Sequence, residues 1–276
     1  GLKMRNTFNP DWLVPDWPVS PGVRAVFTRR AGGVSAAPFD SMNLGDHVGD
    51  LPASVAANRS ILQRATGAHM VFMNQVHGVD TLQLDAASPQ GQRADACVTT
   101  QRSLACTVMV ADCLPVLLTT QDGAVVAAAH AGWRGLAGTG LSSGYGVLES
   151  VYASFRALAQ AGRVQSAIKS IAWLGPCIGP SAFEVGEEVK TAFMDSQPEA
   201  AQFFVPAGPG KYLANLSGLA RLRLQALGVT QVYGNDGSAP WCTVSNSRFF
   251  SHRRDAGIPG NGFGTTGRMA ACIWRD

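Results

Sequence analysis

The sequence has few charged residues and no long apolar segment, and both absences exclude classes of protein. Only 15% of the 276 residues are charged and the formal net charge is +3, so we expect no extended basic surface for nucleic acid. No apolar segment approaches the roughly 20 residues that a membrane-spanning helix needs. The N-terminal segment also lacks the apolar core of a signal peptide. These absences predict a cytoplasmic protein with no nucleic acid and no membrane as its partner.

Several cofactor-binding motifs are also absent. None of the six cysteines belongs to a Cys-x-x-Cys pair, which excludes a zinc ribbon and a thioredoxin-type site. There is no Walker A motif. Residues 262–267 have the spacing G-x-G-x-x-G, but only nine residues follow them, and a dinucleotide-binding βαβ unit needs about thirty. We therefore reject this segment as a dinucleotide-binding motif.

The sequence does contain a globular pattern of short strands and amphipathic helices. Apolar residues make up 46% of the chain, and no linker or internal repeat marks a domain boundary. Apolar periodicity, prolines and glycines predict helices over residues 52–65, 138–161, 186–194 and 216–227. Short apolar segments predict strands over residues 23–28, 71–76, 168–174 and 269–274. This order of strands and helices indicates an α/β fold.

The segment 107–135 carries the strongest indication of a functional site. Two apolar runs flank a Gln-Asp-Gly turn sequence at 121–123, which predicts an antiparallel hairpin. If Thr119 pairs with Ala124 across this turn, Cys113 lies opposite His130, with Cβ atoms roughly 4.5–5.5 Å apart. A thiol and an imidazole are then neighbours beside the polar loop 131–135. The other five cysteines lie among apolar or small residues, so we expect them to be buried free thiols.

A histidine at the end of another predicted strand supplies a third candidate ligand. His77 follows Asn-Gln-Val and is one of only five histidines in the chain. Together, His77, Cys113 and His130 match the Cys-His-His set of catalytic zinc sites, in which one coordination position stays open. Asp95 could orient one of these residues or only end a turn.

Two other kinds of chemistry fit the same residues. Without a metal, Cys113 could act as a thiolate nucleophile with His130 as its base. Copper is an alternative to zinc, since a His₂Cys set also suits a blue-copper centre. A multicopper oxidase needs more imidazole ligands than five histidines provide, which argues against oxidase chemistry.

A series of motifs resembles the YfiH-like laccase-domain family. Each motif is weak alone, but the ordered series extends over nearly the whole chain, from about Val19 to Trp274. The motifs are TRRAGGVS (28–35), SMNLGDHVGD (41–50), NQVHG (74–78), ADCLPVLL (111–118), HAGWRG (130–135), LGPCIGPSAFEVGEEV (174–189), FFSHRRD (249–255) and TTGRMA (265–270). The resemblance implies an N-terminal extension over residues 1–18 and one catalytic domain over residues 19–276. It also implies a mixed α/β fold with largely antiparallel sheets flanked by helices.

The resemblance further implies a metal site of one Cys and two His, which correspond here to Cys113, His77 and His130 as the catalytic residues. It implies phosphorolysis of adenosine, inosine, guanosine and methylthioadenosine, and deamination of adenosine. We predict zinc as the cofactor and a monomer as the active form. The alternatives are a Cys-dependent hydrolase in peptidoglycan editing and a copper-dependent polyphenol oxidase. The chain departs from the family pattern at Asn215, where Asp is frequent, and in the segment 256–264, which is longer than usual.

Phosphorolysis requires a group that binds orthophosphate, and the sequence offers two arginines for it. Arg30 is followed by Gly32 and Gly33, whose backbone N–H groups could approach an anion closely. Arg268 lies in the glycine-containing sequence TTGR. We add Asn43, from a polar loop, to the predicted substrate-binding residues.

Overall fold

Two β-sheets lie at the centre of the molecule. The four-stranded sheet contains, in spatial order, β1 (Val23–Phe27), β13 (Met269–Arg275), β5 (Leu104–Val110) and β2 (His69–Val71). The six-stranded sheet contains β12 (Gln231–Gly234), β8 (Ser170–Leu174), β6 (Leu114–Thr120), β7 (Val126–Ala131), β4 (Ala96–Thr99) and β3 (Thr81–Gln83). A small third sheet contains β10 (Phe204–Gly208), β11 (Lys211–Ala214) and β9 (Glu184–Gly186). The helices are α1 (Pro52–Thr66), α2 (Trp133–Ala137), α3 (Val147–Gln160), α4 (Glu187–Met194), α5 (Leu216–Ala226) and α6 (His252–Asp255).

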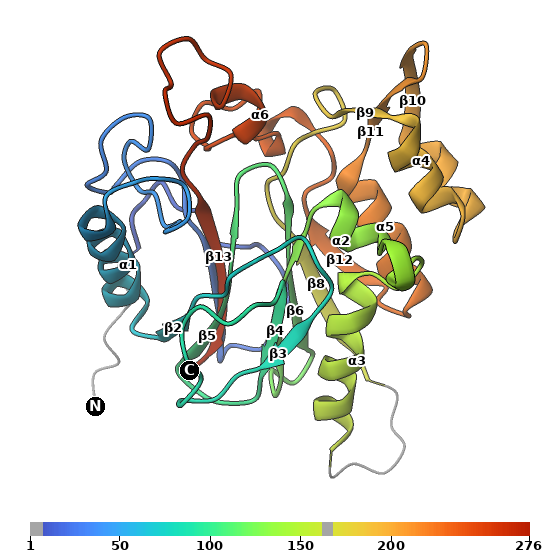
Figure 1. Cartoon of the computed structure of the whole chain (residues 1–276). Helices are drawn as coiled ribbons and strands as arrows, with labels where there is room; N and C mark the ends of the chain where they lie inside the picture. The colour runs from blue at the N-terminus through green and yellow to red at the C-terminus, as the bar shows by residue number, and fades with distance from the viewer. Residues whose placement is uncertain (1–7, 162–167) are drawn as a thin grey trace.

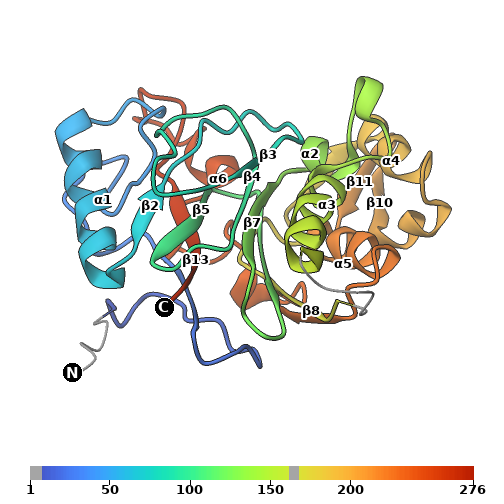
Figure 2. The same ribbon diagram turned by 90° about the horizontal axis from the view of Figure 1, so that it is seen from below.

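The two large sheets pack face to face, and helices cover their outer faces (Figure 1). The computed structural model describes residues 8–161 and 168–276. Seen from below, α1 lies outside the four-stranded sheet, and α3 and α5 lie outside the six-stranded sheet (Figure 2). The architecture is therefore helix, sheet, sheet, helix. In the described part of the chain, no helix has the length and apolar character needed to cross a bilayer.

The central strands are apolar on both faces because each sheet is covered on both sides. In β5, Cys106 faces the core between the two sheets, whereas Ala105 faces the core beneath α1. In β7, Ala128 faces the core between the sheets and Ala129 faces the core beneath α3. This alternation places a continuous apolar layer between the sheets.

The structure confirms the expected mixed α/β fold with largely antiparallel sheets flanked by helices. Most strand pairs are antiparallel, and the parallel pairs are β12 with β8, β2 with β5 and β3 with β4. The predicted strand over 71–76 is wrong in its extent, because β2 begins at His69 and ends at Val71. The next amide, that of Phe72, donates to the side chain of Gln90 at 2.8 Å, which ends the strand pairing.

The helix predicted over residues 138–161 begins only at Val147. The preceding residues form a turn that includes the short 3₁₀ helix η1 (Gly140–Ser142). Gly138 has φ = 70°, and a Cβ at this position would lie 2.1 Å from the Ser142 carbonyl oxygen. The chain therefore needs glycine here, and it bends where apolar periodicity alone predicts a continuous helix.

The described residues of the predicted N-terminal extension pack against the four-stranded sheet. Trp12 is only 5% exposed, and Leu13 pairs with Phe27 in an antiparallel β-bridge. Residues 1–7 lie outside the described residues. The boundary between an extension and a domain at residue 18 stays a prediction.

Candidate metal centre

The predicted hairpin is present and carries two of the three candidate ligands. β6 and β7 pair antiparallel, with Pro115 opposite His130. The expected register, with Cys113 opposite His130, is wrong by two residues. The turn closes with the pair Thr120 and Val125 and not, as predicted, with Thr119 and Ala124. A shift of two residues keeps the same face of the sheet, so the thiol and the imidazole still meet.

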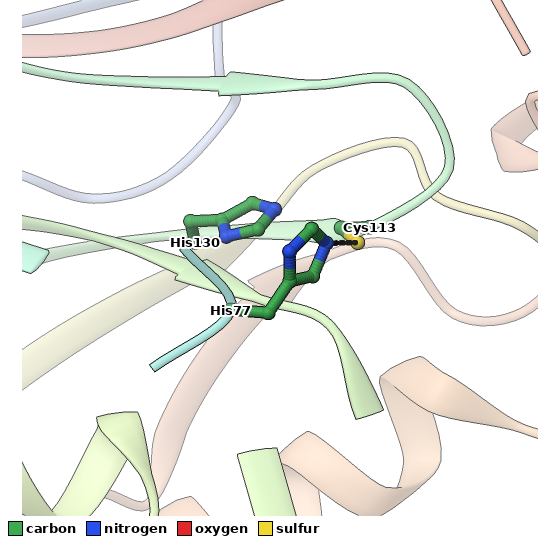
Figure 3. Close-up of side chains that lie close together, drawn as sticks. All are labelled: His77, Cys113 and His130. Carbon is green, nitrogen blue, oxygen red and sulfur yellow. Dashed lines mark hydrogen bonds between the residues drawn. The ribbon is translucent and has the colours of Figure 1, made fainter. Parts of the chain in front are cut away.

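His77 completes a group of three potential metal ligands (Figure 3). One ligand atom from each of His77, Cys113 and His130 lies within 4.8 Å of the other two. The Cys113 Sγ is 3.7 Å from the His77 Nε2. Around a tetrahedral zinc ion, with bonds of about 2.3 Å to sulfur and about 2.0 Å to nitrogen, these atoms would be about 3.5 Å apart. The donor types and this spacing therefore fit a metal ion.

The buried carboxylate of Asp95 holds both histidines in place. Its Oδ2 lies 2.8 Å from His130 Nδ1 and accepts a hydrogen bond from the His77 backbone N–H at 2.9 Å. Its Oδ1 accepts hydrogen bonds from the backbone N–H groups of Val76 and Gly78. These bonds stabilise His77 at φ = 59°, a left-handed conformation that is uncommon outside glycine. When His130 donates its Nδ1–H to Asp95, its Nε2 is left to bind a metal.

Two backbone features bring Cys113 close to its neighbours. A Cβ at Gly132 would lie 2.9 Å from the Cys113 Sγ, so the chain needs glycine at this position. Asp112 has φ = 111°, a strained value for a residue with a side chain. Its carboxylate accepts hydrogen bonds from the Thr243 hydroxyl at 2.6 Å and from the Arg253 backbone N–H at 2.7 Å. These bonds hold the strained residue and tie it to α6.

Electrostatic interactions favour a thiolate at Cys113 and a protonated imidazole at His130 in the metal-free protein. Burial raises the pKa of Cys113, but the charge of His130 and hydrogen bonds with His130 and His77 lower that pKa to about 6. Burial lowers the pKa of His130, but the Cys113 thiolate and the Asp95 carboxylate raise it to about 9. Cys113 is therefore ionised at neutral pH, which is the form that binds metals and attacks electrophiles.

The three residues face a cavity of about 370 Å³, within the size range of small-molecule sites. Four of the five histidines in the chain line it, because His47 and His252 join the two candidate ligands. Burial and the positive charge of Arg268 lower the pKa of both His47 and His252. The sequence motifs alone assign no role to these two histidines. The small number of histidines is the signal that could have identified them.

Arg268 is the one predicted substrate-binding residue that lines this cavity. Its guanidinium donates hydrogen bonds to the backbone carbonyls of Thr266 and Gly267, and no carboxylate of the described chain forms an ion pair with it. Burial lowers the pKa of Arg268, whereas the negative charges of Cys113 and Asp112 raise it. Asn43 is fully buried and accepts a hydrogen bond from the Arg268 backbone N–H at 2.9 Å. Asn43 therefore positions Arg268 and does not itself reach the cavity.

Arg30 does not line the metal cavity. Its guanidinium forms ion pairs with Asp40 at 3.1 Å and with Asp255 at 3.3 Å. The backbone N–H groups of Gly32 and Gly33 both donate to the Ser41 Oγ. The expected phosphate cradle at Arg30 is therefore not formed, since the charge and the amides that would hold phosphate already have partners within the chain.

The fold and the site define a single-domain α/β protein with a Cys-His-His ligand group beside a small-molecule cavity. Residues 24–276 match the family described as multi-copper polyphenol oxidoreductase laccase, and the chain belongs to this family, as its motifs predict. It is 45% identical over 265 residues to purine nucleoside phosphorylase PA4543 of Pseudomonas aeruginosa, an alignment that covers 95% of this chain and 98% of that protein. It is 44% identical, with the same coverage, to purine nucleoside phosphorylase YfiH of Escherichia coli.

Solved structures have the same fold. Protein NMB0706 of Neisseria meningitidis superposes with a TM-score of 0.83 at 43% identity, covering 96% of this chain and 99% of that one. The hypothetical protein YfiH of Bacillus licheniformis superposes with a TM-score of 0.77 at 27% identity, covering 92% and 93% of the two chains.

We expect the substitution Asp95→Asn to weaken metal binding roughly 10- to 100-fold, the usual effect of removing a carboxylate that orients a metal-binding histidine. The amide keeps the size of the side chain, but it loses the charge that faces His130. Its NH₂ group would also face backbone N–H donors where an acceptor is needed. Competition with a chromophoric chelator for Zn²⁺ would measure the change. Asp85→Asn, at an exposed turn, is the matched control, and equal affinities for both variants would contradict this role of Asp95.

Proposed function

We propose that this protein is a zinc-dependent purine nucleoside phosphorylase. The observation that carries the proposal is that one cavity contains both an open Cys-His-His ligand group and Arg268, which has no ion pair within the described residues. Relatives that are 44–45% identical over 95% of this chain are named purine nucleoside phosphorylases. Such an enzyme must hold a nucleoside and orthophosphate side by side, and the cavity offers groups suited to each.

A single zinc ion is the cofactor that we favour. The family description refers to several copper ions, but the described residues contain one group of three His, Cys, Asp or Glu side chains placed to hold a metal. Two imidazoles and one thiolate are an established ligand set for catalytic zinc. Zinc bound there would supply a Lewis acid that polarises a substrate oxygen or activates water.

The side chains of the cavity suggest how the two substrates would be held. Met109, Ile178 and Phe183 supply apolar walls against which a purine could pack. Arg268 would bind orthophosphate through charge-assisted hydrogen bonds and orient it toward the ribose C1′. His252, whose pKa is lowered, would stay neutral at pH 7 and could donate or accept a hydrogen bond beside the phosphate.

We extend the proposal to adenosine, inosine, guanosine and methylthioadenosine as substrates, and to adenosine deamination as a second activity. The motif resemblance supports both extensions. Deamination requires the purine and an activated water but no phosphate, so it would use the ligand group without Arg268. The cytoplasmic location and the monomeric state also stay predictions.

Product analysis with and without orthophosphate tests this function. With adenosine or inosine, we expect a free purine base and ribose 1-phosphate only when phosphate is present. We expect adenosine to yield inosine whether or not phosphate is present. Free ribose that forms without phosphate would indicate a hydrolase, and no turnover of any nucleoside would contradict the proposal.

A Cys-dependent hydrolase is the second candidate, and the ionised pair of Cys113 and His130 favours it. A thiolate can attack an amide carbonyl without a metal, with His130 as the proton donor to the leaving group. Metal-stripped protein that keeps full hydrolase activity would support this candidate over the phosphorylase.

For a copper-dependent polyphenol oxidase we expect little phenol oxidation, because a lone mononuclear site cannot readily deliver four electrons to O₂.

The affinity for zinc should rise as the pH rises. Between pH values of about 6 and about 9, Cys113 is already a thiolate while His130 still carries the proton that the metal must displace. Each binding event then releases one proton from His130, so the apparent affinity for Zn²⁺ should rise about tenfold per pH unit in this range. Calorimetric titrations in buffers with different ionisation enthalpies would count the released protons. An affinity that is independent of pH would contradict this charge state.

A further inference from the structure

A second cavity, of about 360 Å³, shares no lining residue with the metal cavity. We call it the Arg29 groove, and its charged lining residues are Asp11, Arg29, Arg30, Asp40 and Arg248. Three arginines and two aspartates leave one net positive charge on the lining. The groove therefore favours a ligand with a single negative charge.

Ion pairs within the groove neutralise two of its three arginines. Arg30 is paired with Asp40 on the groove wall and with the buried Asp255 behind it. Arg248 lies 3.2 Å from Asp11, and both of these side chains are more than half exposed. Arg29 is the remaining cation, and no residue of the described chain forms an ion pair with it.

The guanidinium of Arg29 is held in place but lacks hydrogen-bond partners. Its Nε is buried and has no acceptor among the described residues. The guanidinium carbon lies over the Phe249 ring, 5.3 Å from the ring centroid, and this cation–π contact helps to hold the side chain in place. Burial and the nearby charge of Arg248 lower the pKa of Arg29, whereas the charge of the Asp11 carboxylate raises it. A buried donor without an acceptor costs free energy, and no residue of the described chain offsets this cost at Arg29.

We propose that the Arg29 groove binds the carboxylate group of a small organic acid. The planar guanidinium can donate two parallel hydrogen bonds to a planar carboxylate, and a carboxylate carries the single charge that the groove lacks. A dianion such as a phosphate monoester would meet the carboxylates of Asp11 and Asp40 with its second charge. The cavity volume is large enough for a small molecule that carries this group.

Ligand-observed NMR with hippurate, a small carboxylate, tests this site, with the neutral hippuramide as the matched probe. We expect hippurate to bind, hippuramide to bind much more weakly, and Arg29→Gln to weaken hippurate binding roughly tenfold or more. Arg29→Lys should weaken it less, because Lys keeps the charge but loses the planar fork. Thermal unfolding of each variant would verify that the fold is retained.

Two control variants separate this site from other arginines and from the metal cavity. Arg24→Gln, at a partly exposed ion pair with Asp276, should not change hippurate binding. Cys113→Ala, which alters the metal cavity, should not change it either. Loss of binding in Cys113→Ala, or equal binding by folded Arg29→Gln and the unmodified protein, would overturn the proposal. Tighter binding of inorganic phosphate than of hippurate at the Arg29 groove would also overturn the assignment to carboxylates.

Discussion

Cys113→Ser is expected to lose its bound metal and to lower nucleoside phosphorolysis by at least about a thousandfold, since a metal ion supplies several kcal/mol of charge stabilisation. The thiolate is the one negatively charged ligand in the group of three. A serine hydroxyl keeps its proton at neutral pH and binds zinc poorly. Elemental analysis of the purified variant and steady-state rates with inosine would measure both effects.

The matched control for this substitution is Cys242→Ser. Cys242 accepts a hydrogen bond from the Gly179 backbone N–H, so a hydroxyl can replace its thiol without leaving that donor unpaired. We expect this variant to retain its metal and its turnover. If Cys113→Ser kept full phosphorolysis after losing its metal, the metal would have no part in the reaction and the proposed mechanism would be wrong.

The second large effect is expected for Arg268→Gln at phosphate concentrations well below saturation. Charge-assisted hydrogen bonds contribute about 1.5–3 kcal/mol each, so the loss of one should lower the kcat/KM for phosphate roughly 10- to 150-fold. Deamination of adenosine by the same variant should fall much less, because this reaction needs no phosphate. The metal content should not change, since Arg268 is not one of the three candidate ligands.

Arg30→Ala provides the contrast for this experiment. Its guanidinium pairs with Asp40 and with the largely buried Asp255, so its removal should lower the stability of the fold. The KM for phosphate should stay unchanged in variant protein that remains folded. If Arg30→Ala raised this KM and Arg268→Gln did not, the phosphate site would lie at Arg30 and our assignment would be reversed.

The parts of the site that are close in sequence could be predicted before the structure. Cys113 directly precedes β6 and His130 lies on β7, and these two strands form one hairpin that local turn chemistry brings together. An error of two residues in register did not change this result, because side chains two apart in a strand share a face. The third ligand, His77, could be proposed because the chain has so few histidines.

The parts of the site that depend on distant residues could not be predicted. His252 reaches the cavity on α6, whose Arg253 amide is held by Asp112, 141 residues earlier in the chain. The ion pair of Arg30 could not be predicted for the same reason, since its partner Asp255 is 225 residues away. No local pattern indicates whether an arginine will find a carboxylate at such a distance.

The mixed α/β class, the family and the residues able to bind a metal could all be predicted from sequence alone. Apolar periodicity, turn residues and donor atoms are properties of short segments, so they are present before the chain folds. Only the tertiary structure decided which cations stay unpaired. Ion pairing depends on separations of a few ångströms between residues far apart in the chain. Packing of the two sheets and of α6 left Arg268 without an ion pair beside the candidate metal centre, and it gave Arg30 two.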